Sequence, residues 1–148
     1  MTRYYSIDEA NAAIPEVERI LIALRDQREE LIARRDKVVE LTPPDDSAPR
    51  ADVAEQIRLL RLSMQGLIDQ MQAGVARLVE LDVTLRDIAS GLIDFPALVS
   101  GRPIWLCWRL GESDIESWHP HDQGFDSRRP LSDLPSGSPG RGSGTPTA

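Results

Sequence analysis

Apolar residues recur every three or four positions along two long stretches of the chain, which is the spacing of an amphipathic helix. The first stretch runs from residue 6 to about residue 41, and Ser6 and Glu9 form the sequence pattern of a capping box at its start. Pro15 lies inside this stretch and removes a backbone hydrogen-bond donor, so the pattern predicts a kink or a break there. The second stretch covers about residues 52–90, with Asp52 as its expected N-cap.

The second stretch keeps a repeat of 3.5 residues over five heptads, which is typical of a helix that packs along its whole length. Three prolines between residues 42 and 49 cannot continue a helix, so the two stretches should fold back as an antiparallel hairpin. Ile68, Val75 and Val79 lie beside the main apolar seam. One neighbouring helix would leave them partly in water, so we expect a homodimer that is formed through the helices.

The character of the sequence changes after residue 91. Residues 104–110 are rich in strand-forming types and are bounded by Gly101 and Gly111, and residues 115–118 can return beside them. This pattern predicts a small β-hairpin at about 103–119. Residues 135–148 contain little that could be buried and are expected to form a disordered tail. The predicted fold is therefore mainly α, a long kinked antiparallel helical hairpin of coiled-coil type with a small C-terminal β-hairpin, in one domain over residues 1–134.

Composition limits the function classes. The 148 residues carry a net charge of −7, so no basic face is expected to bind nucleic acid. No apolar segment reaches the roughly twenty residues that cross a bilayer, so we expect no membrane insertion. The single cysteine cannot form an internal disulfide, and the first residues lack the apolar run of a secretory signal. These features together favour a reduced, cytoplasmic protein.

Candidate chemistry concentrates between residues 118 and 122, where both histidines and a carboxylate lie within five positions. His119 and His121 would project to the same side of an extended chain, and Asp122 or Cys107 could complete the ligands of a divalent transition metal. An enzyme could instead use Cys107 as nucleophile, His119 as base and Asp122 to orient the base. The structural alternative is that Cys107 is a buried apolar side chain and that the other groups hydrogen-bond locally.

Arg109 and Arg128 also have two interpretations. They could bind a small anion or another ligand together with Arg129. The interpretation that we favour is structural, because nearby carboxylates outnumber the arginines and can pair with them.

Several motifs carry a resemblance to a known family. They are residues 5–11 (YSIDEAN), 14–16 (IPE), 91–98 (GLIDFPAL), 106–112 (LCWRLGE), and Trp118-His119 followed by Asp122, Gly124, Phe125 and Arg128. With these motifs, residues 4–131 resemble the bacterial family catalogued as domain of unknown function 2203. His119 and Asp122 fall on motif positions of that family and His121 does not. The resemblance implies a cytoplasmic protein with no assigned activity.

The sequence as a whole therefore favours binding or assembly over catalysis as the role of the protein. The alternative is a metal-binding protein or a small enzyme that uses Cys107, His119 and Asp122.

Overall fold

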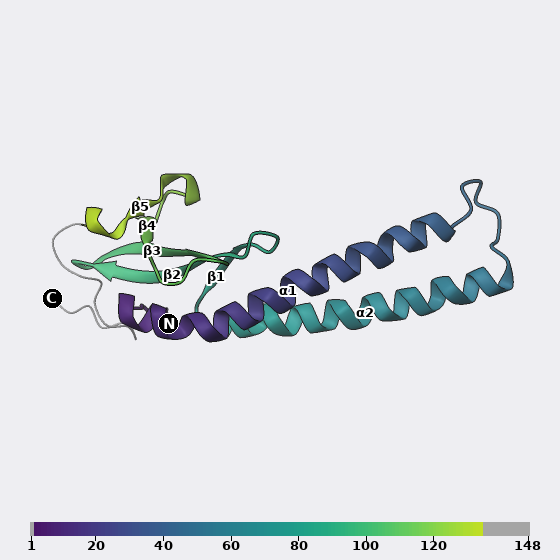
Figure 1. The fold of residues 1–148 in the computed structure, drawn as a ribbon, viewed down its shortest axis with the longest axis horizontal. Coiled ribbons are helices and arrows are strands. Elements are labelled where there is room, and N and C mark those ends of the chain that lie inside the picture. The colour runs from purple at the N-terminus through teal and green to yellow at the C-terminus, as the bar shows by residue number, and fades with distance from the viewer. Residues whose placement is uncertain (1, 135–148) are drawn as a thin grey trace.

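The computed structural model describes residues 2–134 and contains two long helices beside a five-stranded antiparallel sheet (Figure 1). Helix α1 spans Ile7–Leu41 and helix α2 spans Ala51–Glu80. They run antiparallel, and their outer halves extend well beyond the sheet as an arm (Figure 1). The predicted tail at residues 135–148 lies outside the described residues. The predicted helical hairpin is therefore present, although α2 is shorter than predicted.

Helix α1 begins where the sequence predicted. The Ser6 hydroxyl accepts a hydrogen bond from the Glu9 backbone at 3.0 Å, and the Glu9 carboxylate accepts one from the Ser6 backbone at 3.0 Å. The helix continues through Pro15, so the prediction of a break at this residue is wrong. Burial of Val17 and Leu21 on the following turns stabilises the helical path by more than the one lost backbone hydrogen bond costs.

Helix α2 ends at Glu80, ten residues earlier than predicted. Asp82 takes a positive φ of 57°, and the chain then turns into strand β1, Thr84–Asp87. Leu85 keeps the heptad spacing, but it pairs with Ile93 of the sheet instead of continuing the helix. The prediction of Asp52 as the N-cap of α2 is also wrong. The N-cap residue is Arg50, and its side chain makes no capping hydrogen bond.

The sheet is larger than the predicted β-hairpin at 103–119. Its strands follow the order β1-β2-β3-β4-β5, with β2 at Leu92–Val99, β3 at Arg102–Arg109, β4 at Ser117–Pro120 and β5 at Arg129–Pro130. Strands β2 and β3 pair along their whole length through a turn at Ser100 and Gly101, both with positive φ. Asp94 and Pro96 alternate with buried apolar residues of β2, which lies between β1 and β3 in the sheet.

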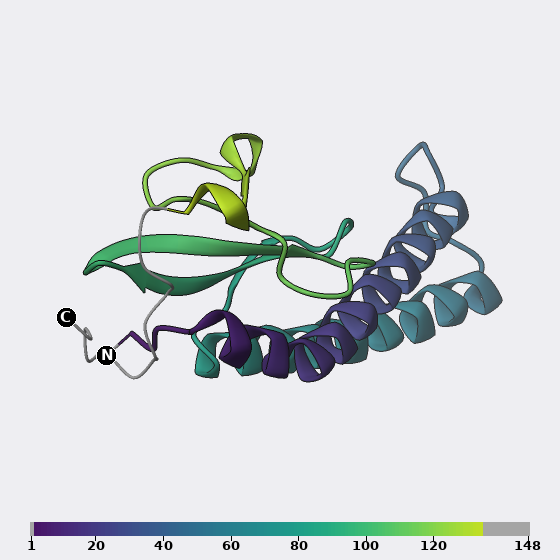
Figure 2. The same cartoon turned by 60° about the vertical axis from the view of Figure 1, so that its left-hand side comes forward.

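The hydrophobic core lies between the helices and one face of the sheet. Ile93, Phe95, Leu106 and Trp108 point into it, together with buried residues from the first half of α1. The C-terminal segment, with short 3₁₀ helices at Phe125–Ser127 and Leu131–Asp133, lies over the opposite face (Figure 2). The sheet is therefore covered on both faces.

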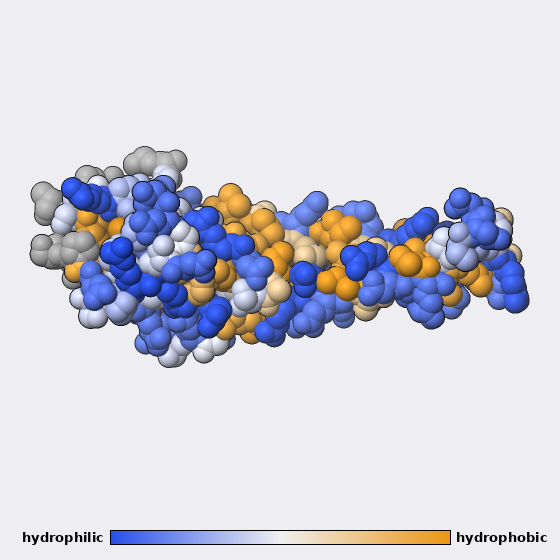
Figure 3. Space-filling model, turned by 90° about the horizontal axis from the view of Figure 1, so that it is seen from above, coloured by the Kyte–Doolittle hydropathy of each residue, from blue (hydrophilic) through white to orange (hydrophobic). Residues whose placement is uncertain are grey.

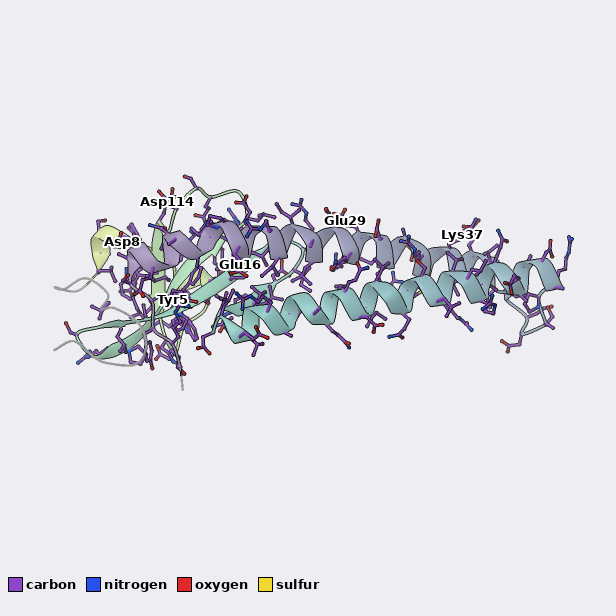
Figure 4. All side chains as sticks on the ribbon, turned by 90° about the horizontal axis from the view of Figure 1, so that it is seen from below. Tyr5, Asp8, Glu16, Glu29, Lys37 and Asp114 are labelled. Carbon is purple, nitrogen blue, oxygen red and sulfur yellow. The ribbon has the colours of Figure 1, made fainter. Side chains whose placement is uncertain are left out.

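The outer arm has little core of its own. No residue between 25 and 41 of α1 is buried, and Ile57 is the single buried residue between 51 and 66 of α2. Charged side chains such as Glu29 and Lys37 project along it (Figure 4). No helix within residues 2–134 has the length and apolarity needed to cross a membrane.

Candidate functional site

The register of the sheet brings three polar side chains into one row. Asp94 of β2 lies opposite Cys107 of β3, and Cys107 lies opposite Ser117 of β4. His119 lies two residues along β4, opposite Trp105. Because side chains alternate between the faces of a strand, these residues share the face that points away from the helices. The sheet thus collects polar groups on the face that the C-terminal segment covers.

Asp94, Cys107 and His119 form a compact buried cluster, with relative exposures of 1%, 0% and 1%. The Cys107 thiol lies 3.2 Å from Asp94 Oδ1, and His119 Nε2 lies 3.0 Å from Asp94 Oδ2. One ligand atom from each residue lies within 4.8 Å of the other two. We refer to these three residues as the Asp-Cys-His cluster.

The charge of Asp94 is compensated from the solvent side. Arg86 Nε donates to Asp94 Oδ2 at 2.8 Å, and the guanidinium carbon of Arg86 lies 4.9 Å from the centre of the Trp105 ring. The Arg86 side chain is 40% exposed, whereas the Asp94 side chain is 2% exposed. Arg86 therefore separates the cluster from water on that side.

The second nitrogen of His119 and the proton of Cys107 complete the arrangement. His119 Nδ1 lies 3.0 Å from the backbone oxygen of Pro120, which places a proton on Nδ1 and directs Nε2 toward Asp94. Burial, followed by the negative charge of Asp94, raises the pKa of the Cys107 thiol far above its ordinary value. The Cys107 thiol therefore keeps its proton when no metal is bound. Because the thiolate is the reactive form of a cysteine, Cys107 is poorly suited to act as a nucleophile.

The predicted histidine pair is divided in the structure. The His121 ring is stacked on Trp105, with ring centres 4.8 Å apart, and both His121 and Asp122 are exposed. Neither belongs to the Asp-Cys-His cluster. Of the predicted catalytic and metal residues, the structure brings together Cys107 and His119, with Asp94 as the carboxylate in place of Asp122.

The two predicted anion-binding arginines contact protein groups. Arg128 Nε donates to the Ser117 hydroxyl at 2.8 Å, and Arg128 Nη2 donates to Glu112 at 2.9 Å. The guanidinium carbon of Arg109 lies 5.8 Å from the centre of the Phe125 ring. Arg128 therefore ties the C-terminal segment to β4.

Sequence reasoning missed Asp94 and Arg86. Asp94 lies 13 residues from Cys107 and 25 residues from His119, so its proximity depends on the strand register. A usable signal was present, since Asp94 is the one charged residue in an otherwise apolar run from Leu92 to Val99. A carboxylate in such a run needs a buried partner if the run is a central strand.

A second candidate site is apolar and lies on the helices. Leu31, Ile68, Met71 and Val75 line a hollow between α1 and α2, and Val75 also lines a second hollow against the edge strand β1. Apolar surface gathers on the arm and where it meets the sheet (Figure 3). We call this surface the apolar strip; it consists of Leu31, Ile68, Met71, Val75, Val79 and Leu85.

Comparison with known proteins identifies the family. The family described as uncharacterized conserved protein, DUF2203, matches residues 3–131. The chain belongs to this family. The DUF2203 match includes both helices, the whole sheet, the Asp-Cys-His cluster and the apolar strip, and it confirms the resemblance that the sequence motifs indicated. No curated protein and no solved structure matched the chain.

Proposed function

We propose that the chain is an assembly protein, and that it associates with a second copy of itself through the apolar strip. The observation that carries this proposal is the continuity of the strip. It passes from the arm to the edge of the sheet, because Val75 lines both hollows, with Asp82 and Thr84 at the border of the second one. Val79, which follows on the same helix, has 66% of its surface exposed. Contiguous apolar surface of this kind is typical of an interaction site.

The strip can form the centre of a dimer interface. It follows α2 from Ile68 to Val79, about 17 Å at the helical rise, and β1 runs back beside the end of this helix (Figure 1). With a width of two elements, about 20 Å, the footprint is on the order of 350 Å² per copy, so neighbouring surface of the arm must supply the rest of the roughly 800 Å² of a standard interface. Partners related by a twofold axis present the same patch to each other, so an apolar strip can face its own copy.

The charge of the arm also favours a second copy. Residues 25–41 carry five basic and five acidic side chains, so this part of α1 is neutral although the chain has a net charge of −7. Two arms can therefore lie together without strong repulsion, whereas a strongly charged partner would find no complementary field there. Strand β1 is an edge strand beside the strip, and a second copy would cover this edge as well.

The test is the mass in solution of the full chain and of two matched variants. Val79→Glu places a charge in the strip at a residue that is 66% exposed in the single chain, and a dimer formed through the strip should dissociate at least 100-fold more readily. Leu62→Glu makes the same kind of change on α2 at a side chain that is 58% exposed and lines neither hollow of the strip, so it should leave the mass unchanged.

Sedimentation equilibrium at several concentrations distinguishes the outcomes. A monomeric parent chain at tens of micromolar would refute the proposal. A dimer that both variants weaken equally, or that neither weakens, would place the interface on another surface and would also overturn it.

A further inference from the structure

We propose that the Asp-Cys-His cluster is a binding site for a divalent transition metal of the zinc type, with Asp94, Cys107 and His119 as its three protein ligands. This ligand set differs from the sequence-predicted one, because Asp94 replaces His121 and Asp122. It does not depend on self-association, since all three ligands come from the sheet of one chain.

The donor atoms are already close to the spacing that a metal requires. In a tetrahedral site with bonds of about 2.0–2.3 Å, ligand atoms lie roughly 3.3–3.7 Å apart. Asp94 accepts from Cys107 at 3.2 Å and contacts His119 Nε2 at 3.0 Å, and the donor atoms of all three residues lie within 4.8 Å of one another. Small rotations of the buried side chains are therefore sufficient to place all three donors around one ion.

The surroundings orient these ligands as they do in known metal sites. The Pro120 backbone oxygen accepts from Nδ1 of His119, so Nε2 is the ring nitrogen that can bind a metal once the proton that it directs at Asp94 Oδ2 has left. Arg86 Nε is bonded to Asp94 Oδ2, so it fixes the carboxylate while Oδ1 faces Cys107. Groups that orient ligands in this way are a general feature of metal centres.

The chemistry of the donors selects the class of metal. A thiolate, an imidazole and a carboxylate form a borderline-soft set that suits Zn²⁺ and neighbouring transition metals, while Mg²⁺ and Ca²⁺ prefer oxygen ligands. Binding replaces the Cys107 thiol proton by a metal–sulfur bond and the His119 Nε2 proton by a metal–nitrogen bond, and both protons leave to solvent. The thiolate and the Asp94 carboxylate then balance the two positive charges of the ion, and Arg86 keeps its contact with the carboxylate. Among residues 2–134, no fourth Cys, His, Asp or Glu joins the group, so further coordination positions are left to water or a small ligand.

Cobalt titration tests the site directly. Co²⁺ is added to the full chain, purified without a histidine tag and stripped with chelator, and the ultraviolet and visible spectrum is recorded. The site predicts one equivalent of Co²⁺ per chain, with the charge-transfer band of a thiolate–cobalt bond, and displacement of that band by one equivalent of Zn²⁺. Absence of the band in the folded parent chain would overturn the proposal without any variant.

Variants then assign the ligands. Cys107→Ser should abolish the charge-transfer band, and Asp94→Asn and His119→Gln should each weaken binding at least tenfold. His121→Gln is the matched control, because His121 is the other histidine of the chain and lies outside the cluster. Circular dichroism verifies that each variant is folded. Loss of binding in His121→Gln, or an unchanged band in Cys107→Ser, would assign the metal to another site and refute the cluster as its ligand set.

Discussion

Replacing each histidine by alanine should have very different effects on stability. His119 is 1% exposed, and its ring nitrogens contact the Pro120 backbone oxygen and Asp94. Losing these two hydrogen bonds costs on the order of 2 kcal/mol. Removing the ring also leaves a cavity of roughly 60 Å³, which adds about 1.5 kcal/mol at about 24 cal/mol per Å³. We therefore expect His119→Ala to lower the free energy of unfolding by about 3.5 kcal/mol.

His121→Ala should cost well under about 1 kcal/mol. Its exposed ring is stacked on Trp105, but the hydrogen bond from Trp105 Nε1 goes to the His121 backbone oxygen, which alanine retains. Urea unfolding followed by circular dichroism measures both variants, with chelator present so that bound metal does not contribute, and at equal chain concentration. Equal losses for the two variants, or a loss below about 0.5 kcal/mol for His119→Ala, would refute the assignment of His119 as a buried hydrogen-bonding group.

Three further substitutions test the fold by thermal or urea unfolding. Tyr5→Phe should cost about 1 kcal/mol, because the Tyr5 hydroxyl donates to the Leu81 backbone oxygen at 2.5 Å. Burial raises the pKa of Tyr5 above 10.0, so the parent should lose stability as the pH rises above that value, and the variant should lose less; identical pH profiles would contradict this. Gly91→Ala should destabilise by more than about 1 kcal/mol, because Gly91 has a φ of 67° and a Cβ there would lie 2.6 Å from Leu110. Gly66→Ala is the opposite case, since a Cβ in this helical position meets nothing within 4 Å, so the substitution should stabilise the protein by up to about 1 kcal/mol. Equal losses of stability in Gly66→Ala and Gly91→Ala would contradict this reasoning.

Local signals predicted the start of α1 and the presence of two long helices. The pairing of Ser6 with Glu9 depends on residues three apart, so a sequence pattern can identify it. The same holds for Ile68 and Val75, whose place beside the helical seam follows from their spacing, and both lie partly exposed in the structure. The end of α2 was not predictable in this way, because Leu85 keeps the helical repeat while its strand pairing with Ile93 comes from the tertiary structure.

The cluster was only partly predictable for the same reason. Cys107 and His119 stood out as the single cysteine and one of two histidines. Their common partner Asp94 did not, because it joins them through the register of β2, β3 and β4, which no local pattern specifies. His121 and Asp122 were attractive candidates because they are adjacent to His119 in sequence. The turn after β4 places both of them at the surface instead.

The mass of the full chain in solution is the most direct test of self-association through the apolar strip. Sedimentation equilibrium at tens of micromolar should give twice the 16.5 kDa of one chain for the parent and for Leu62→Glu. Val79→Glu should give the mass of a single chain under the same conditions. A parent that remains at 16.5 kDa at every concentration measured would contradict the proposed assembly.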